Sequence, residues 1–389
     1  MKKFLAFFLC FIILLTASCA PSDSAVTTTA TTAATTEVLQ DQGIQNIILI
    51  IGDGMGPNQV TTGQLYAGET FGFTQWAHTT ANTNSVNGDG EPVQTTDSAA
   101  AATALATGML TTNGRVGRDA DAKDLKTIMD YASQDYGKAT GVISTDLMNG
   151  ATPAGFSAHA DNRGDTDAIL LSQIKSGLNL LCSAFTGEAV ENRNLAKSAG
   201  YTYCDSLYEA KACAEEGKNG YWQLSCSDFN ATDKLADVAT TALDLLDQDP
   251  DGFVLMIEQA QVDKHGHSNN FLGSCKCVNV LNDTVEAILT WLGDRTDTAI
   301  IITADHETGG LEYSSEPDFA NSITGKDGST QIYYNYTSTG HTPTEVDVYA
   351  YGFTPNFEKY YTEERPSSIK NTDIFKIMLN LLEDPMQEG

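Results

Sequence analysis

A single hydroxyl residue, Ser98, stands between an acidic residue and a run of small residues in this chain of 389 residues. Asp97 precedes Ser98, four alanines follow it, and Gly108 closes the stretch. A serine in the first turn of a helix lies at the positive end of the helix dipole, which stabilises anions and developing negative charge. Small neighbours would let a reacting group come close. The alternative is structural, because Asp97 or Ser98 could simply cap the helix.

Acidic residues and histidines gather in four further segments, which together hold Asp53, Glu258, Asp263, His265, His267, Asp305, His306 and His341. Asp263 and His267 stand four residues apart, so they can converge on one cation. Asp305 and His306 supply a carboxylate and an imidazole side by side. Zinc binds such donors, and a zinc site that keeps an open position is catalytic. Four of the chain's six histidines lie in these segments, which favours a metal site over scattered structural histidines.

The elements that must position these groups are apolar runs at 46–51, 139–145, 252–257 and 298–303, with helical patterns between them at 124–134, 167–176, 234–246 and 280–292. Each run is typical of a buried parallel strand. The alternation predicts an α/β fold, a doubly wound and mostly parallel sheet flanked by helices. Ligands bind such sheets at the carboxyl ends of the strands, where Asp53, Glu258 and Asp305 stand.

In their order along the chain, these motifs resemble those of the alkaline phosphatase family, the metal-dependent phosphomonoesterases. The matching motifs are Asp-Gly-Met-Gly at 53–56, Thr-Asp-Ser-Ala at 96–99, Ala-Thr-Pro at 151–153, His159 to Arg163, Glu258, Asp263 to His267, Thr-Ala-Asp-His at 303–306 and Gly-His-Thr at 340–342. Any one of them is weak, whereas the ordered set is specific. The resemblance runs from about residue 46 to residues 373–375 and implies an alkaline phosphatase-like core.

The resemblance implies two Zn²⁺ and one Mg²⁺, with these ligands: Asp263, His267 and His341 for the first zinc; Asp53, Asp305, His306 and Ser98 for the second; Asp53, Thr152 and Glu258 for magnesium. Ser98 would attack phosphorus and form a phosphoserine intermediate. Arg163 would clamp the phosphate with its planar fork, and Lys264 would contact phosphate through water. Two neighbouring metals can stabilise both the attacking and the leaving oxygen, and hard oxygen donors suit magnesium.

Two features depart from the family pattern. Gly150 stands two residues before Thr152, where relatives commonly carry an acid or a histidine at the magnesium shell, so Lys264 lacks its usual acidic partner. Only residues 307–340 separate His306 from His341, so the large crown insertion of animal relatives is expected to be absent. Residues 177–233 are interpreted as a small insertion, either a lid or a dimer-related excursion.

The N-terminus predicts export. Residues 1–18 have a basic start and a short apolar run, typical of a signal peptide rather than a membrane span. Small residues before Cys19 favour a lipoprotein signal with Cys19 lipidated, the alternative being ordinary secretion. Residues 19–43 form a predicted Thr/Ala-rich tether, and residues 44–389 the catalytic domain. The location is therefore periplasmic or at the cell surface, with the membrane contacted only through the lipid anchor.

The net charge of the chain limits its binding partners, and its cysteine content bears on disulfide bonding. The formal net charge of −29 disfavours nucleic acid and anionic membranes. The six cysteines beyond Cys19 favour disulfides in an exported protein, with no pairing fixed: Cys182, Cys204, Cys213, Cys226, Cys275 and Cys277. By analogy with the family, a homodimer is expected.

The leading hypothesis is a broad-specificity phosphate-monoester hydrolase that acts on small phosphate monoesters outside the cytoplasm. One alternative is a phosphodiesterase of the same superfamily. The other is a surface lipoprotein that binds phosphate or metal without turnover. The sequence does not identify the physiological substrate.

Overall fold

The computed structural model describes residues 43–185, 190–225 and 234–384. The predicted signal peptide, the predicted lipidation site Cys19, almost all of the predicted tether and Cys226 lie outside the described residues. None of the helices in the described ranges is both long and apolar enough to cross a membrane.

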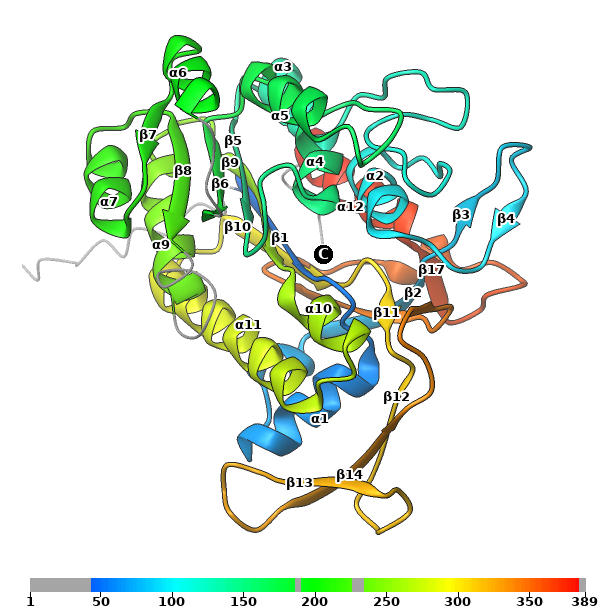
Figure 1. Cartoon of the computed structure of the whole chain (residues 1–389). Helices are drawn as coiled ribbons and strands as arrows, with labels where there is room; N and C mark the ends of the chain where they lie inside the picture. The colour runs from blue at the N-terminus through cyan, green and yellow to red at the C-terminus, as the bar shows by residue number, and fades with distance from the viewer. Residues whose placement is uncertain (1–42, 186–189, 226–233, 385–389) are drawn as a thin grey trace, which may run out of the picture. The chain divides into compact units, whose positions relative to one another are not determined.

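A ten-stranded sheet forms the centre of the fold (Figure 1). In spatial order its strands are β17 (Ser368–Lys370), β2 (Ala77–Asn82), β16 (Val346–Tyr351), β10 (Thr298–Thr303), β1 (Asn46–Gly52), β9 (Phe253–Gln259), β5 (Ala139–Ser144), β6 (Leu180–Phe185), β8 (Gly220–Ser225) and β7 (Thr202–Cys204). Strand β16 runs antiparallel to both β10 and β2, and every other neighbouring pair is parallel. The sheet is therefore mostly parallel, as predicted.

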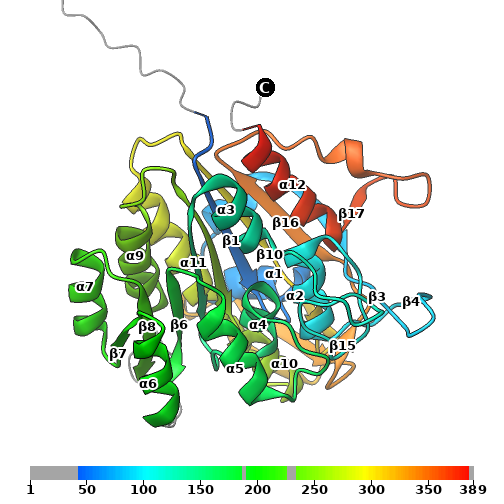
Figure 2. The ribbon, with the colours of Figure 1, turned by 90° about the horizontal axis from the view of Figure 1, so that it is seen from above.

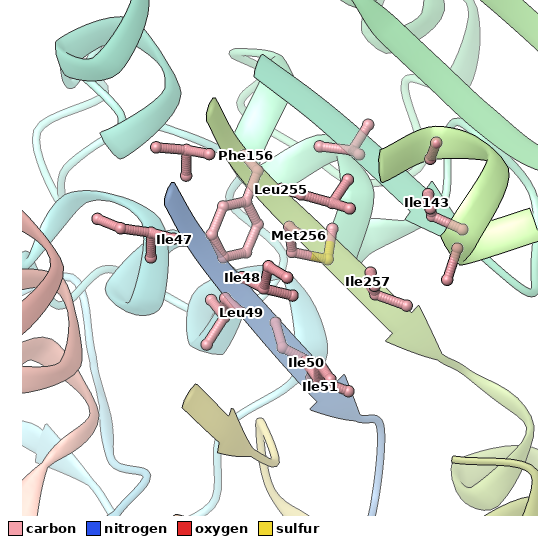
Figure 3. Packing of buried hydrophobic residues seen from close by; sticks show 14 of the residues in the cluster. Ile47, Ile48, Leu49, Ile50, Ile51, Ile143, Phe156, Leu255, Met256 and Ile257 are labelled. Carbon is pink, nitrogen blue, oxygen red and sulfur yellow. The ribbon is translucent and has the colours of Figure 1, made fainter. Parts of the chain in front are cut away.

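Strand β1 lies at the centre because both of its faces are apolar. All seven of its residues are buried, and Ile48 is in register with Ile300 of β10 and Leu255 of β9. Figure 3 shows the side chains of β1 packed beside those of β9, with Phe156 of the neighbouring helix against them. Full burial of each large aliphatic side chain contributes about 1.5–3 kcal/mol. This packing fixes the strand ends that carry the polar groups.

Helices cover both faces of the sheet (Figure 2). One layer packs together α1 (Pro57–Ala67), α11 (Phe271–Leu292), α9 (Lys234–Leu246) and α7 (Leu207–Glu215). The other packs together α12 (Asn371–Glu383), α2 (Ser98–Thr107), α3 (Ile128–Tyr136), α4 (Ala151–Ser157) and α5 (Thr166–Lys175). Helix α6 (Val190–Ser198) packs on β7, and the short α10 (Gln261–His267) leads into α11.

The minor elements lie between these main ones. They are the ribbons β3 (Ser85–Val86) with β4 (Pro92–Val93) and β11 (Glu307–Thr308) with β15 (His341–Thr342), the small sheet of β12 (Leu311–Ser314), β14 (Gln331–Tyr336) and β13 (Asn321–Thr324), and the 3₁₀ helices η1 (Gly72–Gln75) and η2 (Phe357–Tyr360). Only the β12–β14–β13 sheet and its loops fill residues 309–340, so the predicted absence of a large crown is confirmed.

The four predicted strands and four predicted helices are all present, and two of the helices, α3 and α11, start several residues away from the predicted positions. Helix α3 begins at Ile128 rather than Asp124, because Thr127 and Asp130 form a capping box there. Helix α11 begins at Phe271, nine residues before the predicted start, because the Asn270 side chain accepts a hydrogen bond from Gly273 N. Capping side chains set both starts more precisely than apolar periodicity does.

Residues 177–233 differ from the expectation. Their described part supplies β6, β8 and β7, which extend the main sheet instead of forming a lid. The reason is packing, because Leu180, Tyr221 and Trp222 are fully buried in the core. The five cysteines in the described residues are free thiols, so no disulfide is seen among Cys182, Cys204, Cys213, Cys275 and Cys277.

Candidate metal centre

The polar groups meet where the carboxyl ends of three central strands lie side by side (Figure 1). Asp53 follows β1, Glu258 lies at the end of β9, and Asp305 follows β10. Two hydrogen bonds tie these ends together: Asp53 N donates to Gln259 O across 3.1 Å, and Gly54 N donates to Asp305 Oδ1 across 3.1 Å. The predicted position of the site at the strand ends is therefore what the fold produces.

Ser98 is the first residue of α2, and its neighbour Asp97 is the cap. Asp97 Oδ1 accepts from Ala100 N across 3.0 Å, so the structural role proposed for this motif belongs to Asp97. Ser98 Oγ is free to face the cluster and lies 3.3 Å from His306 Nε2. The small residues bring α2 against α4: a Cβ on Gly155 would stand 2.7 Å from Ala102 Cβ.

The first donor group comprises Asp263, His267 and His341. Asp263 and His267 share one face of α10, with 3.3 Å between Asp263 Oδ1 and His267 Nε2. His341, on β15, brings its Nε2 to 3.5 Å from the same Oδ1 and 3.3 Å from His267 Nε2. Three ligand atoms thus converge from two distant segments.

Hydrogen bonds behind the rings orient the histidines. His267 Nδ1 lies 2.6 Å from Thr339 O, and His341 Nδ1 lies 2.8 Å from Thr96 O. A carbonyl oxygen only accepts, so each Nδ1 carries the hydrogen and each Nε2 presents its lone pair to the cluster. This is the tautomer that a metal ligand needs.

The second donor group surrounds His306, whose side chain is fully buried. Its Nε2 lies 3.2 Å from Asp305 Oδ2 and 3.6 Å from Asp53 Oδ1. Asp263 also lies within reach of Asp53 and His306, so it adjoins both groups. With Ser98, every residue expected around the second zinc is in one place.

The third group consists of Asp53, Thr152 and Glu258. Glu258 Oε2 accepts a hydrogen bond from Ser144 Oγ, and the Thr152 hydroxyl of α4 faces the Glu258 carboxylate. Only oxygen atoms meet here, which is the donor set that magnesium prefers.

The buried carboxylates of this cluster repel one another, and bound cations would relieve that repulsion. Burial raises the pKa of Asp53 well above its usual value, and the nearby Asp305 and Asp263 charges raise it further. Burial likewise raises the pKa of Glu258 to about 7 and the pKa of Asp305 to about 6. Buried carboxylates crowded together are costly unless paired with positive charge. Three buried oxygen atoms also lack hydrogen-bond partners: Asp53 Oδ1, Thr152 Oγ1 and Asp305 Oδ2. The residues therefore fit divalent metals.

Asp263 and His306 behave differently from the other groups. Burial alone would raise the pKa of Asp263, but its contacts with the His341 imidazole and the Thr308 hydroxyl lower it below its usual value. Burial lowers the pKa of His306 far below its usual value. A neutral imidazole and an ionised carboxylate are the forms that bind metal.

Two cationic side chains border the cluster. Arg163 donates from Nη1 to Asp97 Oδ2 across 3.0 Å, which places its guanidinium beside the residue before Ser98. Lys264 Nζ lies 2.7 Å from Asp146 Oδ2. Gly150 caps α4 without a side chain. His265 does not join the metal ligands, because its Nδ1 lies 3.1 Å from Asn270 Nδ2.

Sequence reasoning missed the residues that support the ligands. Thr308, Ser144 and Asp146 contact predicted site residues through hydrogen bonds or an ion pair. Glu307 accepts a hydrogen bond from the hydroxyl of Thr342, the neighbour of His341. Glu307 and Thr308 directly follow His306, and Ser144 and Asp146 lie at the end of a predicted strand. Adjacency to a motif was the only signal that could have found them.

Comparisons with known proteins point to a single family. A family model described as alkaline phosphatase matches residues 44–195 and 225–336. Alkaline phosphatase 4 of Bacillus subtilis is 28% identical over 419 aligned residues, which cover 87% of this chain and 89% of that protein. The Escherichia coli alkaline phosphatase is 27% identical over 392, covering 81% of this chain and 82% of its own.

Solved structures give the same result. The alkaline phosphatase of the Antarctic bacterium TAB5 superposes with a TM-score of 0.73 at 26% identity, covering 88% of this chain and 98% of that one. A variant of the TAB5 protein was solved with magnesium bound.

Proposed function

Since this chain belongs to the alkaline phosphatase family, we propose that it is a broad-specificity phosphate-monoester hydrolase with Ser98 as its nucleophile. The observation that carries the mechanism is the placement of Ser98 Oγ. It lies at the N-terminus of α2 and 3.3 Å from His306 Nε2. Its hydrogen-bond partner is an imidazole, and in the described ranges no lysine or arginine is hydrogen-bonded to it, so metal ions would supply the positive charge.

The cofactors proposed are two Zn²⁺ and one Mg²⁺. Imidazole-containing sets suit zinc, and the all-oxygen set suits magnesium. The proposed ligands are Asp263, His267 and His341 for the first zinc, Asp53, Asp305, His306 and Ser98 for the second, and Asp53, Thr152 and Glu258 for magnesium. When bound, these cations neutralise the buried carboxylates, lower the pKa of coordinated oxygens and stabilise negative charge on the oxygens that enter and leave phosphorus.

In the proposed reaction, Ser98 Oγ attacks phosphorus and loses its proton. A new Oγ–P bond forms, the P–O bond to the alcohol breaks, and the alcohol leaves with a proton. Water then attacks the phosphoserine, the Oγ–P bond breaks, and inorganic phosphate departs. The dipole of α2 favours the anionic form of Ser98 at this position.

Two cations of the chain would bind the phosphoryl oxygens. Arg163 presents a planar fork whose Nη1 is held by Asp97, so its remaining donors are oriented for two oxygens. Lys264 would contact phosphate through water as a point charge. A net charge of −29 repels anionic substrates, so these local cations and the metals would have to overcome that field.

The test is hydrolysis of p-nitrophenyl phosphate against pH by the full chain, stripped with a chelator and refilled with zinc, with and without magnesium. Zinc-restored turnover that rises above neutral pH is expected, because the ligands must lose protons to bind metal. Bis-p-nitrophenyl phosphate serves as the control substrate, on which little activity is expected. Preferential diester cleavage would favour a phosphodiesterase. Tight phosphate binding without turnover would favour a binding lipoprotein.

We also propose export, with residues 1–18 removed and Cys19 lipidated, and a homodimeric state. The basic and apolar N-terminal pattern supports the first proposal, and family analogy supports the second. Mass spectrometry of the mature N-terminus tests the cleavage and lipidation, and light scattering tests the homodimeric state. The partners proposed are small phosphate monoesters, with no specific nucleic acid, and the membrane only through the lipid.

A further inference from the structure

Lys264 is held at the edge of the metal centre by an acid that no motif identifies. It lies on α10, directly after Asp263, and its charge interacts with those of Asp53 and Asp263. Its Nζ is 2.7 Å from Asp146 Oδ2. Asp146 belongs to the loop between β5 and α4, so the ion pair joins the loop before Thr152 to the helix that carries two zinc ligands.

The backbone of Asp146 is fixed from two sides. Its N–H donates to Ser144 Oγ across 3.0 Å, and its carbonyl accepts from Ala184 N across 3.0 Å. The same Ser144 hydroxyl donates to Glu258 Oε2. The backbone from which the Asp146 carboxylate extends is therefore held in place relative to Glu258 of the third donor group.

Position 150 does not supply this partner. Gly150 has no side chain, and a Cβ there would stand 2.9 Å from the Leu147 carbonyl oxygen. Gly150 N donates to that same oxygen across 2.9 Å. The tight turn at 147–150 leaves Asp146, on the other side of the turn, to face Lys264.

We propose that Asp146 is a positioning residue that holds the Lys264 ammonium in place to bind the phosphate of substrate and product. The inference rests on the proposed phosphatase function. A lysine has a long, flexible side chain, and an ammonium held in place loses less freedom when phosphate binds. The side chains of Lys264 and Asp146 are 52% and 29% exposed, and such exposed pairs contribute little to stability.

The direction in which Asp146→Asn changes the affinity for phosphate separates a positioning role from a simple charge effect. Removing a negative charge beside a phosphate site should tighten phosphate binding if Asp146 acts only through its field. Loss of positioning should weaken it. We expect Asp146→Asn to raise the Kd for inorganic phosphate about three- to tenfold, an effect of the size of one charge-assisted contact.

The experiment is a double-mutant cycle on the full chain loaded with zinc and magnesium, with inorganic phosphate as the calorimetric probe. The variants are Asp146→Asn, Lys264→Gln and the double variant. Asp146→Asn should have no effect in the Lys264→Gln background. Asp146→Glu should restore part of the affinity. The matched control is Asp135→Asn, whose partner Lys126 also lies at 2.7 Å but away from the site, and it should leave the Kd unchanged.

Three results would overturn the proposal: tighter or unchanged phosphate binding in Asp146→Asn, an equal loss in the Lys264→Gln background, or a loss of bound magnesium measured by elemental analysis. Hydrolysis by the wild type is measured beside binding. A wild type that binds phosphate but does not hydrolyse monoesters overturns the proposed function, whereas the cycle still decides the role of Asp146. A wild type that does neither overturns both.

Discussion

The Thr308 hydroxyl donates to Asp263 Oδ1 across 2.6 Å and lies 3.2 Å from His306 Nδ1. One oxygen can do both, because it donates its hydrogen to the carboxylate and accepts the ring N–H. Thr308 therefore orients a ligand of each proposed zinc site. It also fixes the His306 tautomer, so that Nε2 faces Asp305 and Ser98.

Replacing Thr308 by valine should weaken zinc binding, because the shape is kept while both hydrogen bonds are lost. Loss of such supporting contacts costs about 10–100-fold in metal affinity. Competition with a zinc chelator measures the effect. Thr308→Ser keeps the hydroxyl and serves as the control. Equal zinc affinity in Thr308→Val and the wild type would show that the hydroxyl does not orient the ligands.

Replacing Ser98 by alanine should remove turnover while inorganic phosphate still binds. The nucleophile is lost, whereas the proposed metal and arginine contacts remain. We expect kcat to fall by about 10³-fold or more. Stopped assays with p-nitrophenyl phosphate measure kcat, and calorimetry measures phosphate binding. Retained turnover in Ser98→Ala would exclude a phosphoserine intermediate at this residue.

Glu307 should stabilise the strand that carries His341. This buried carboxylate accepts hydrogen bonds from Gln59 Nε2 (2.7 Å), Gly310 N (3.1 Å), Leu311 N (3.2 Å) and the Thr342 hydroxyl. In Glu307→Gln, an amide NH₂ group replaces one of the two carboxylate oxygens. This group cannot accept hydrogen bonds, so some of the donors around it lose their partner. The free energy of unfolding should fall by about 2–4 kcal/mol, measured by chemical denaturation.

The control for Glu307 is Glu312→Gln. Glu312 is exposed and accepts a single contact from Asn335 Nδ2 across 3.2 Å, so its replacement should change stability by less than about 0.5 kcal/mol. A similar small change in Glu307→Gln would mean that the four contacts do not stabilise this region.

The metal-free protein should lose stability as pH rises from about 4 to about 7. Burial raises the pKa of Asp305 to about 6 and of Glu258 to about 7 in the folded chain, against ordinary values of 3.8 and 4.5. Between these values the folded state holds more protons than the unfolded state, so the free energy of unfolding falls as pH rises. Denaturant titrations of metal-stripped protein at pH 5 and pH 7.5 measure this difference.

Glu258→Gln should flatten that pH dependence, because its amide does not titrate. Added zinc and magnesium should restore stability at pH 7.5, since cations compensate the ionised carboxylates. Stability that increases with pH in the metal-free protein would contradict the burial of these acids.

The α2–α4 contact should not tolerate a methyl group. Gly155→Ala would place Cβ 2.7 Å from Ala102 Cβ and push apart the helices that carry Ser98 and Thr152. A loss of about 1–3 kcal/mol is expected from overpacking, read from the thermal midpoint. Gly72→Ala is the control, because no atom lies within 4 Å of a Cβ there. Equal midpoints would show that α4 can shift without cost.

The sequence predicted the strands and the clustering of the proposed ligands better than it predicted the residues that support them. Continuous apolar runs identify β1, β5, β9 and β10, because strands buried on both faces need them. The proposed ligand residues stand at the ends of these runs or within recognisable motifs. Thr308 and Asp146 could not be assigned a role in this way, since Thr308 contacts Asp263 and Asp146 contacts Lys264, and both of these partners lie far away in the sequence.

The sequence pattern also did not predict how far the sheet extends. Residues 177–233 were expected to form an excursion, although their buried Leu180, Tyr221 and Trp222 extend the sheet. Short strands interrupted by charged helices lack the long apolar runs of the centre. Tertiary packing, rather than local pattern, decides where such segments lie.

His341 reaches the cluster on β15, which pairs with β11, the strand just after His306. Asp53, in contrast, follows β1, the first strand in the sequence. The proposed donors thus come from nearly the whole length of the domain, and no short piece of the chain contains a complete set. Cations bound here would link segments that lie far apart in the sequence, from Asp53 to His341. Because closing such large loops carries an entropic cost that folding has already met, metal uptake should follow assembly of the sheet and then make unfolding more cooperative.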